Sequence, residues 1–324
     1  MDVANALTKI GRGPTLCEDL ARDEAYALFK RMLSGTVSPV RLGALLMALR
    51  WKGETIDELL GFAEALGEHT ISMQAPHGSR RVAIIPTYAS RHSQPNLMPA
   101  LALRLAQTGV PVLVHGSLGE GRLPPSFDVL RRLGRPHATT LAEAAESLAL
   151  HNLAVVPTRL LAPELDALLL LRDELGARHV GHLVAKLIDP MPDRSLRLIC
   201  ASQPEAISSL HDLLLDMGAE AMLMHAPDGE SCASAERRPR ITWLRHGEAN
   251  VLYDEEPTGW APLPLRCDPN DPDAVAQLIR EIMEGRRATP TPLSNQLAAC
   301  LYATGHARDL MHARAMVAVG IGLT

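Results

Sequence analysis

The chain has 324 residues, of which 47% are hydrophobic, 21% are charged and 3% are aromatic. This composition is typical of a globular protein with one large domain or two medium ones, and so few aromatic rings argue against a platform that stacks several exposed bases. The formal net charge of -5 argues against a nucleic-acid binder with an overall basic surface, although it leaves room for a local basic face.

Cysteine usage and the start of the chain bear on the cellular compartment. The five cysteines are scattered and lack C-x-x-C spacing, which predicts reduced thiols and no zinc site. The first thirty residues carry charges throughout, so they do not form the apolar segment of a signal peptide. No uncharged apolar run is long enough to span a bilayer. We therefore expect a cytoplasmic protein that has no membrane partner.

The first seventy residues are predicted to form helix after helix. Ser38-Pro39 is typical of a helix start, Gly53 of a helix end, and Thr55 with Glu58 three residues later has the form of a capping box. The helix that begins after Ser38 and ends at Gly53 is apolar nearly all round. This pattern indicates either burial inside the subunit or a face shared with a second copy.

From residue 81 onward, short apolar runs alternate with amphipathic helical stretches. The expected strands are Val82–Ile85, Val110–Val114, Ala154–Val156, Leu196–Cys200, Ala221–Met224 and Ile241–Leu244. Strands that alternate with helices predict a mainly parallel sheet with helices on its faces. Residues 226–239 and 253–272 are rich in Pro, Asp, Glu and Gly and are expected to be loops.

These patterns predict an α/β protein with two domains. A small all-helical N-terminal domain comprises residues 1–70, joined by about 163–190. A larger α/β domain with a mainly parallel central sheet comprises residues 71–162 and 191–324.

Four stretches carry a family resemblance that runs almost from end to end: "MLSGTVSPVRLGALLMALRWKGETIDELLGFAEAL", "GVPVLVHG", "ELGARHVGHLVAKLIDP" and "NQLAACLYATGHARDLMHARAMVAVG". They resemble anthranilate phosphoribosyltransferase and its relatives, glycosyltransferase family 3. The resemblance implies a nucleoside phosphorylase/phosphoribosyltransferase-like fold, an active site between the two domains, and a homodimer through the N-terminal helical domain.

The motifs that this family uses to bind phosphoribosyl pyrophosphate differ here. The family's Gly-Thr-Gly-Gly-Asp loop corresponds to Pro86-Thr87-Tyr88-Ala89-Ser90, where proline removes a backbone donor and tyrosine adds bulk. The Asn-x-Ser-Thr motif keeps only Asn96, and Lys-His-Gly-Asn becomes Val114-His115-Gly116-Ser117. The resemblance thus implies a degenerate ligand cleft that comprises Thr87, Tyr88, Ser90, Asn96, His115, Gly116, Arg122 and Ser126.

The remaining motifs differ in the same way. The Ser-Ser-Lys loop corresponds to Gly121-Arg122-Leu123, and the Asp-Glu pair that holds magnesium corresponds to Ser231 and Cys232. A hydroxyl and a thiol do not replace two carboxylates around a hard cation. Losing metal ligands and phosphate donors costs many orders of magnitude in the rate of phosphoribosyl transfer. We therefore expect no catalytic residue, no metal and no cofactor at this cleft.

The same departures resemble a branch of the family, typified by YbiB, that keeps the fold and the dimer. That resemblance implies binding of DNA or RNA without sequence preference. The segment "AERRPRITWLRHG" has four arginines in nine residues and no nearby acid after Glu236, and arginine donates to phosphate in pairs. Arg178 matches an arginine that the enzymes use near the acceptor, and Lys186 stands where they have proline. The candidate nucleic-acid or anion contacts are Arg178, Lys186, Arg237, Arg238, Arg240 and Arg245.

Two alternatives stay open at this point. The arginines could form an ordinary solvated loop face, and the retained polar residues of the cleft could serve a pentosyltransferase that uses a different donor or acceptor. A third interpretation is a scaffold or ligand-binding protein with neither activity. His179 and His182 lie three residues apart on a helix, but without a third ligand they do not predict a metal site.

Overall fold

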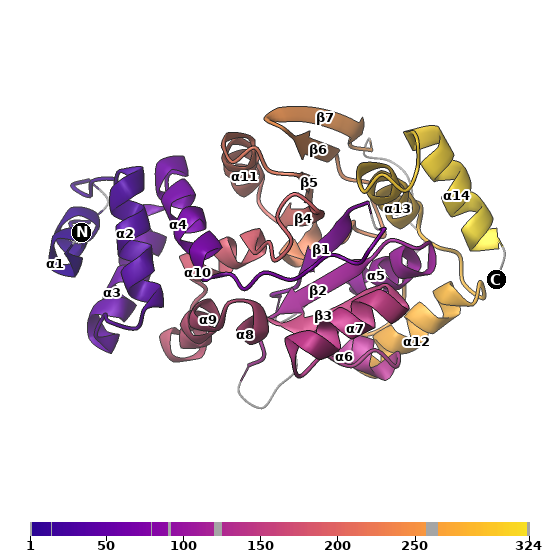
Figure 1. Cartoon of the computed structure of the whole chain (residues 1–324), viewed down its shortest axis with the longest axis horizontal. Helices are drawn as coiled ribbons and strands as arrows, with labels where there is room; N and C mark the ends of the chain where they lie inside the picture. The colour runs from indigo at the N-terminus through magenta and orange to yellow at the C-terminus, as the bar shows by residue number, and fades with distance from the viewer. Residues whose placement is uncertain are drawn as a thin grey trace. The chain divides into compact units, whose positions relative to one another are not determined.

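The computed structural model describes residues 2–13, 15–78, 80–89, 92–119, 125–256 and 265–322. The chain divides into two compact units (Figure 1). The first comprises Met1–Ser72 and Thr158–Pro190, and the second comprises Met73–Pro157 and Met191–Thr324. The helices within the described residues are too short or too polar to cross a membrane.

The first unit is all-helical, as its sequence pattern predicts. Its elements are α1 (Val3–Ile10), α2 (Arg22–Leu33), α3 (Pro39–Lys52), α4 (Ile56–His69), α8 (Thr158–Leu161), α9 (Pro163–Leu175), α10 (Val180–Val184) and the 3₁₀ turn η1 (Ala185–Leu187).

The start of α4 confirms the predicted capping box. The Thr55 hydroxyl accepts from the Glu58 N–H at 3.3 Å, and the Glu58 carboxylate accepts from the Thr55 N–H at 2.9 Å. The fully buried Glu58 also accepts from the Leu20 N–H at 2.9 Å and pairs with Lys52 Nζ at 2.8 Å. The Glu58 carboxylate therefore connects the end of α3, the start of α4 and the loop before α2.

Helix α3 is apolar nearly all round but is not buried all round. It buries Leu45, Leu46 and Leu49, whereas Val40 is 84% and Trp51 is 82% exposed. These two exposed side chains lie eleven residues apart, about three helical turns, so they project from the same side of the helix.

The second unit is built on one seven-stranded sheet in the order β3-β2-β1-β4-β5-β6-β7. The strands are β1 (Val82–Pro86), β2 (Val112–Gly116), β3 (Leu153–Pro157), β4 (Ser195–Ala201), β5 (Ala221–His225), β6 (Ile241–Arg245) and β7 (Glu248–Tyr253). The strands from β3 to β5 pair in parallel, and β6 and β7 pair antiparallel. The predicted α/β fold with a mainly parallel sheet is confirmed.

Strand β7 is absent from the sequence prediction. Its first four residues are exposed, so it lacks the apolar run by which the other strands are recognised. The turn before it explains the hairpin: His246 and Gly247 have φ values of 52° and 77°, the left-handed pair that a tight two-residue connection requires.

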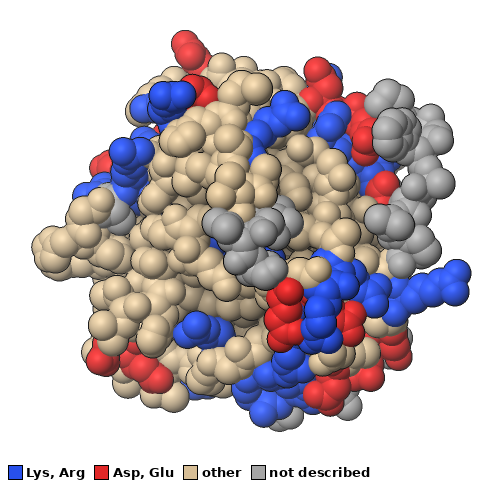
Figure 2. Space-filling view, turned by 90° about the vertical axis from the view of Figure 1, so that its right-hand side faces the viewer, with Lys and Arg blue, Asp and Glu red and all other residues tan. Residues whose placement is uncertain are grey.

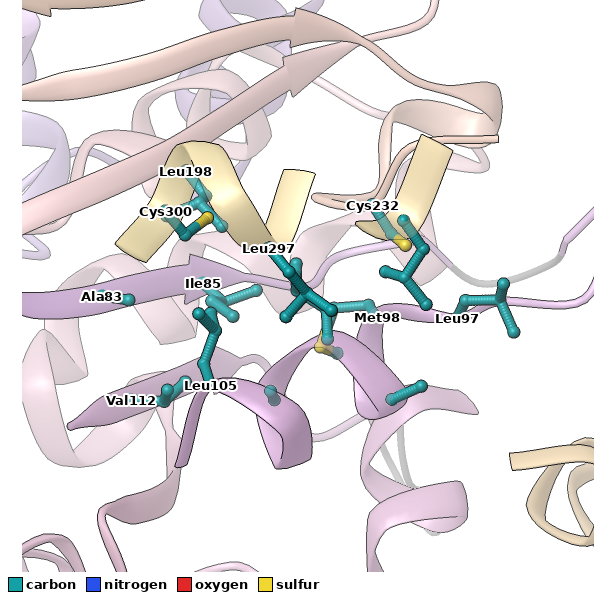
Figure 3. Close-up of a cluster of buried hydrophobic side chains, with 14 of the residues drawn as sticks. Ala83, Ile85, Leu97, Met98, Leu105, Val112, Leu198, Cys232, Leu297 and Cys300 are labelled. Atoms are coloured by element: carbon teal, nitrogen blue, oxygen red, sulfur yellow. The ribbon is translucent and has the colours of Figure 1, made fainter. Parts of the chain in front are cut away.

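The helices of the second unit are α5 (Met98–Gln107), α6 (Pro125–Arg132), α7 (Leu141–His151), α11 (Pro204–Asp216), α12 (Pro272–Met283), α13 (Thr291–Ala303) and α14 (Leu310–Gly322), with a 3₁₀ turn η2 (Pro227–Gly229). Ala83 and Ile85 of β1 face α5 and α13, where Met98, Leu297 and Cys300 complete the cluster (Figure 3). The intervening residues of β1 are equally buried but point to the other face. Burial on both faces is the expected environment of a parallel sheet.

Candidate functional site

The polar residues of the predicted cleft meet at the carboxyl end of β1 and β2. Here the chain runs from β1 outward through β2 to β3, and then returns to pair β4 with the opposite side of β1. Ligands of open α/β sheets bind outside such a reversal. Just beyond β1, the Thr87 N–H donates to the His115 carbonyl at 2.8 Å and extends the ladder by one bond.

A buried carboxylate lies at the centre of this edge. Glu230, which follows η2, is 4% exposed, and its Oε2 lies 2.8 Å from the Thr87 hydroxyl. Its Oε1 accepts from the Ala89 N–H at 2.9 Å. The Ser126 hydroxyl at the start of α6 lies 2.7 Å from that of Thr87 and 3.4 Å from Glu230 Oε2. Donors from the end of β1 thus converge on a side chain of the segment after β5.

Asn96 completes this group from the segment before α5. Its Nδ2 donates to the Ser126 hydroxyl at 2.8 Å, while its Oδ1 accepts from the Met98 N–H at 2.9 Å. Four predicted or neighbouring polar residues are therefore bonded to one another.

Tyr88 and His115 form a second buried pair. The Tyr88 hydroxyl lies 2.9 Å from His115 Nδ1, and the two rings pack edge to face at 5.6 Å. His115 Nε2 has no hydrogen-bond partner among the described residues. Complete burial lowers the pKa of His115 to about 3, so the ring is neutral at physiological pH.

The glycine beside this pair is required by close packing. A Cβ on Gly116 would lie 2.4 Å from the Thr87 carbonyl oxygen and 3.4 Å from the Phe127 ring. The absence of a Cβ at Gly116 therefore allows the last residue of β2 to pack closely against the backbone of Thr87.

Ser231 and Cys232, which we expected from the sequence to stand at the magnesium-ligand positions, make their contacts within the protein. The Ser231 hydroxyl lies 3.0 Å and 2.9 Å from the carbonyls of Pro86 and Leu198, so it bridges the end of β1 and the middle of β4. Burial raises the pKa of the Cys232 thiol well above its ordinary value. Across the described part of the chain, no three His, Cys, Asp or Glu side chains are grouped as metal ligands would be.

Sequence reasoning missed Glu230, although it is adjacent to Ser231. Its one signal was its presence in "HAPDGESC" beside the aligned positions. Of the predicted cleft residues, the structure brings together Thr87, Asn96 and Ser126 around Glu230, and Tyr88 with His115 and Gly116. Ser90 and Arg122 lie outside the described residues.

The arginines before β6 have acidic neighbours that the local sequence does not show. Arg237 pairs with Glu255 at 2.8 Å, and Arg240 pairs with Asp254 at 3.2 Å. Arg238 donates to the Asp254 carbonyl at 3.0 Å and packs over the Tyr253 ring.

The prediction that no acid lies near this segment is therefore wrong in three dimensions. Asp254, Glu255 and Glu256 follow β7, and the β6–β7 hairpin returns them to the residues before β6. Three arginines lie beside three acidic residues, and two of the arginines form ion pairs with them, so the positive charge of the cluster is largely balanced.

Arg245 lies at the other end of β6. Its Nε is 3.6 Å from Glu220, and its guanidinium packs over the Trp243 ring at 5.4 Å. Arg245, Trp243 and Tyr302 line a hollow of about 500 Å³ together with residues of β7. A cationic side chain and two aromatic side chains therefore line the same hollow. The low aromatic content of the sequence did not predict this grouping.

Arg178 and Lys186 belong to the first unit, not to the unit that holds the other four candidates. Arg178 lies two residues before α10, and its carbonyl accepts from the Arg50 guanidinium. Lys186 is half-buried in η1. Beside Arg178, His179 Nδ1 accepts from the Gly181 N–H at 3.2 Å. This histidine thus caps the helix.

Charges of both signs lie together elsewhere on the surface. On the face shown in Figure 2, basic and acidic side chains are intermixed and separated by uncharged surface. Arg132 of α6 bridges Asp128 and Asp273 at 2.5 Å and 2.6 Å, and Arg131 pairs with Asp128 at 2.8 Å. Arg131 and Arg132 therefore provide a second paired arginine cluster for comparison.

Comparison with known proteins places this chain in a family. A glycosyl transferase family helical bundle domain matches residues 4–70. The uncharacterized protein YbiB of Escherichia coli K12 is 35% identical over 318 residues, covering 98% of this chain and 99% of YbiB. Anthranilate phosphoribosyltransferase of Rhodospirillum rubrum is 29% identical over 329 residues, covering 99% and 91%. The chain belongs to the anthranilate phosphoribosyltransferase-like glycosyl transferase family.

Solved structures agree with this membership. Anthranilate phosphoribosyltransferase from Thermus thermophilus has a TM-score of 0.74 and 25% identity, covering 99% of this chain and 96% of that one. The enzyme from Saccharomyces cerevisiae has a TM-score of 0.69 at 14% identity, covering 99% and 96%, which shows the shared fold alone. The chain thus shares the architecture of these enzymes, with an all-helical first unit and a second unit built on a mainly parallel sheet.

Proposed function

We propose that this family member binds DNA or RNA through phosphate contacts without sequence specificity, acts as a homodimer, and does not transfer phosphoribosyl groups. The observation that carries the proposal is the set of arginines at both ends of β6. Arg237, Arg238 and Arg240 precede the strand, and Arg245 ends it. Five residues of extended chain separate Arg240 from Arg245 by about 17 Å, so the two ends would contact different phosphates of one strand.

The ion pairs of these arginines can be exchanged for phosphate contacts. The Arg240 and Asp254 side chains are 63% and 78% exposed, and ion pairs at such sites contribute at most about 1 kcal/mol. A phosphate oxygen offers the same charge and accepts from the same guanidinium fork. The neighbouring acids and the net charge of -5 both reduce the positive electrostatic potential that a phosphate would meet at these arginines.

The geometry at the end of β1 supports the absence of phosphoribosyl transfer. The Thr87 hydroxyl and the Ala89 N–H are engaged by Glu230, and the Tyr88 ring is packed on His115. The side chains at the magnesium positions, Ser231 and Cys232, do not fit that ion, because a carbonyl-bound hydroxyl and a buried thiol are poor ligands for it.

The alternative is a pentosyltransferase with a different donor or acceptor. Family membership favours it, and so does Nε2 of buried His115 at this edge of the sheet, which lacks a hydrogen-bond partner among the residues that the structure describes. A screen of phosphorylated sugars and nucleosides for turnover tests this alternative directly.

Homodimerisation is supported by α3. Val40 and Trp51 form an exposed apolar stripe on one side of this helix, with Ala44 exposed between them. Large exposed apolar side chains grouped in this way mark interaction surfaces. A second copy of the same helix, related by twofold symmetry, would cover the stripe.

The decisive experiment is a fluorescence-polarisation titration with labelled single- and double-stranded oligonucleotides at several salt concentrations. Replacing Arg237, Arg238 and Arg240 with alanine should weaken binding and reduce the salt slope by roughly 3 units, because each phosphate contact contributes about 0.9. The matched control is Arg131→Ala with Arg132→Ala, which removes arginines that are also paired with acids. A Lys186→Ala variant tests the candidate of the first unit.

The acidic partners provide the opposite test. Neutralising them as Asp254→Asn, Glu255→Gln and Glu256→Gln should strengthen binding and steepen its salt dependence, because the arginines then lack competing carboxylates. No binding of either oligonucleotide at low salt, or equal effects of the β6 and α6 arginine variants, would overturn the proposal.

A further inference from the structure

The contacts of Glu230 have the character of a bound anion. Its two carboxylate oxygens accept from different donors, the Thr87 hydroxyl at 2.8 Å and the Ala89 backbone N–H at 2.9 Å. The donors that reach Glu230 from the described residues are neutral: the Thr87 and Ser126 hydroxyls and the Ala89 N–H. A buried carboxylate is stabilised where such donors are already aimed at it.

The donors behind Thr87 are ordered so that they support this charge. Each hydroxyl has one proton. The Asn96 amide donates to the Ser126 hydroxyl at 2.8 Å, Ser126 donates to Glu230 Oε2 at 3.4 Å, and Thr87 donates to the same oxygen at 2.8 Å. Chains of hydrogen bonds that run in one direction polarise one another and strengthen the final bond. The direction of this chain favours a negative group at its end.

The acceptor and the donors belong to separate parts of the chain. Glu230 lies 143 residues from Thr87 in the sequence and enters from the segment after η2. The donors, by contrast, belong to the segment that follows β1, to the segment before α5 and to α6. The donors therefore belong to other segments than Glu230, and we expect them to keep their positions when its side chain is removed.

We propose that Thr87, Ala89 and the Asn96–Ser126 relay form an anion site that the chain's own Glu230 occupies, and that loss of this carboxylate opens the site to small oxyanions. Formate reproduces the carboxylate that is removed, and inorganic phosphate offers the same acceptor oxygens. An attached ligand acts at a high effective concentration. The wild-type protein is therefore closed to free anions at millimolar concentration.

The test is thermal unfolding of the wild type, Glu230→Ala and Glu230→Gln in sodium formate, sodium phosphate and sodium chloride at matched ionic strength and pH 7.5. The Ala variant should have a lower Tm than the wild type in chloride, and formate or phosphate should raise its Tm saturably by several degrees. The Gln variant is the matched control. Its side chain still fills the site, so it should respond as the wild type does.

A second change distinguishes the site from a general salt effect. Adding Thr87→Val to Glu230→Ala removes the hydroxyl donor and should abolish most of the anion-dependent rise in Tm. If Glu230→Ala does not fold in chloride, the same comparison is made as refolding yield with and without formate. Equal Tm values or equal refolding yields in all three salts would overturn the proposal. These readouts do not involve oligonucleotide binding, so they stand or fall separately from it.

Discussion

Acid destabilisation through His115 is a prediction that follows from its burial. The unfolded chain has an ordinary histidine with a pKa near 6.5, whereas the folded protein lowers the pKa of His115 to about 3 because its ring is desolvated. Between these values the unfolded state binds the proton and the folded state does not. The protein is therefore expected to lose stability as pH falls from about 6.5 toward 3.

The size of the effect follows from the two pKa values. At pH 7.5 neither state is appreciably protonated at this residue. At pH 5.5 the unfolded histidine is protonated about ten to one, which favours unfolding by about 1.4 kcal/mol. A His115→Gln variant cannot titrate, although its amide can still hydrogen-bond near Tyr88. The stability difference between the wild type and this variant should therefore shrink by about 1.4 kcal/mol between pH 7.5 and pH 5.5.

Urea unfolding followed by tryptophan fluorescence measures this difference. A Trp51→Phe background removes the tryptophan of the first unit, so the signal then reports the second unit, which holds His115. The control is His151→Gln, at an exposed position of α7. A difference that stays constant across this pH range would refute the reasoning, since simple loss of packing does not depend on pH in this way.

Three further outcomes are expected. Gly116→Ala should destabilise the second unit by about 1–3 kcal/mol in urea unfolding, because the new Cβ meets backbone 2.4 Å away, and an unchanged midpoint would contradict the close packing. The double variant Val40→Asp and Trp51→Asp should convert a dimer to a monomer in sedimentation velocity. The control Leu150→Asp, also at an exposed apolar position, should leave the dimer intact. A wild type that already sediments as a monomer would refute the α3 interface. Glu58→Ala should cost about 3–5 kcal/mol, because it breaks a buried ion pair and leaves Lys52 with Asp19, whose side chain is mostly exposed. It also removes the acceptor of the Leu20 and Thr55 N–H groups. Thermal unfolding followed by circular dichroism measures the loss of stability, and a loss below about 1 kcal/mol would contradict this reasoning.

Local signals in the sequence sufficed where neighbouring residues decide the structure. The Thr55 and Glu58 capping box lies within one helical turn, and its bonds form as the pattern indicates. The alternation of apolar runs with helices identified the parallel part of the sheet, because strands buried on both faces are apolar along their whole length. Strand β7 was missed because its mostly exposed side chains carry no such pattern.

The sequence alone thus determined the fold class, the family resemblance and the types of residue at the cleft. Tertiary structure alone decided which residues meet there. Glu230 reaches Thr87 across 143 residues because β5 and β1 flank the same strand, β4. The acids after β7 reach the arginines before β6 because a hairpin reverses the chain. Both effects come from strand pairing between distant segments, which composition and local spacing do not encode, and both change the charge that a ligand would meet.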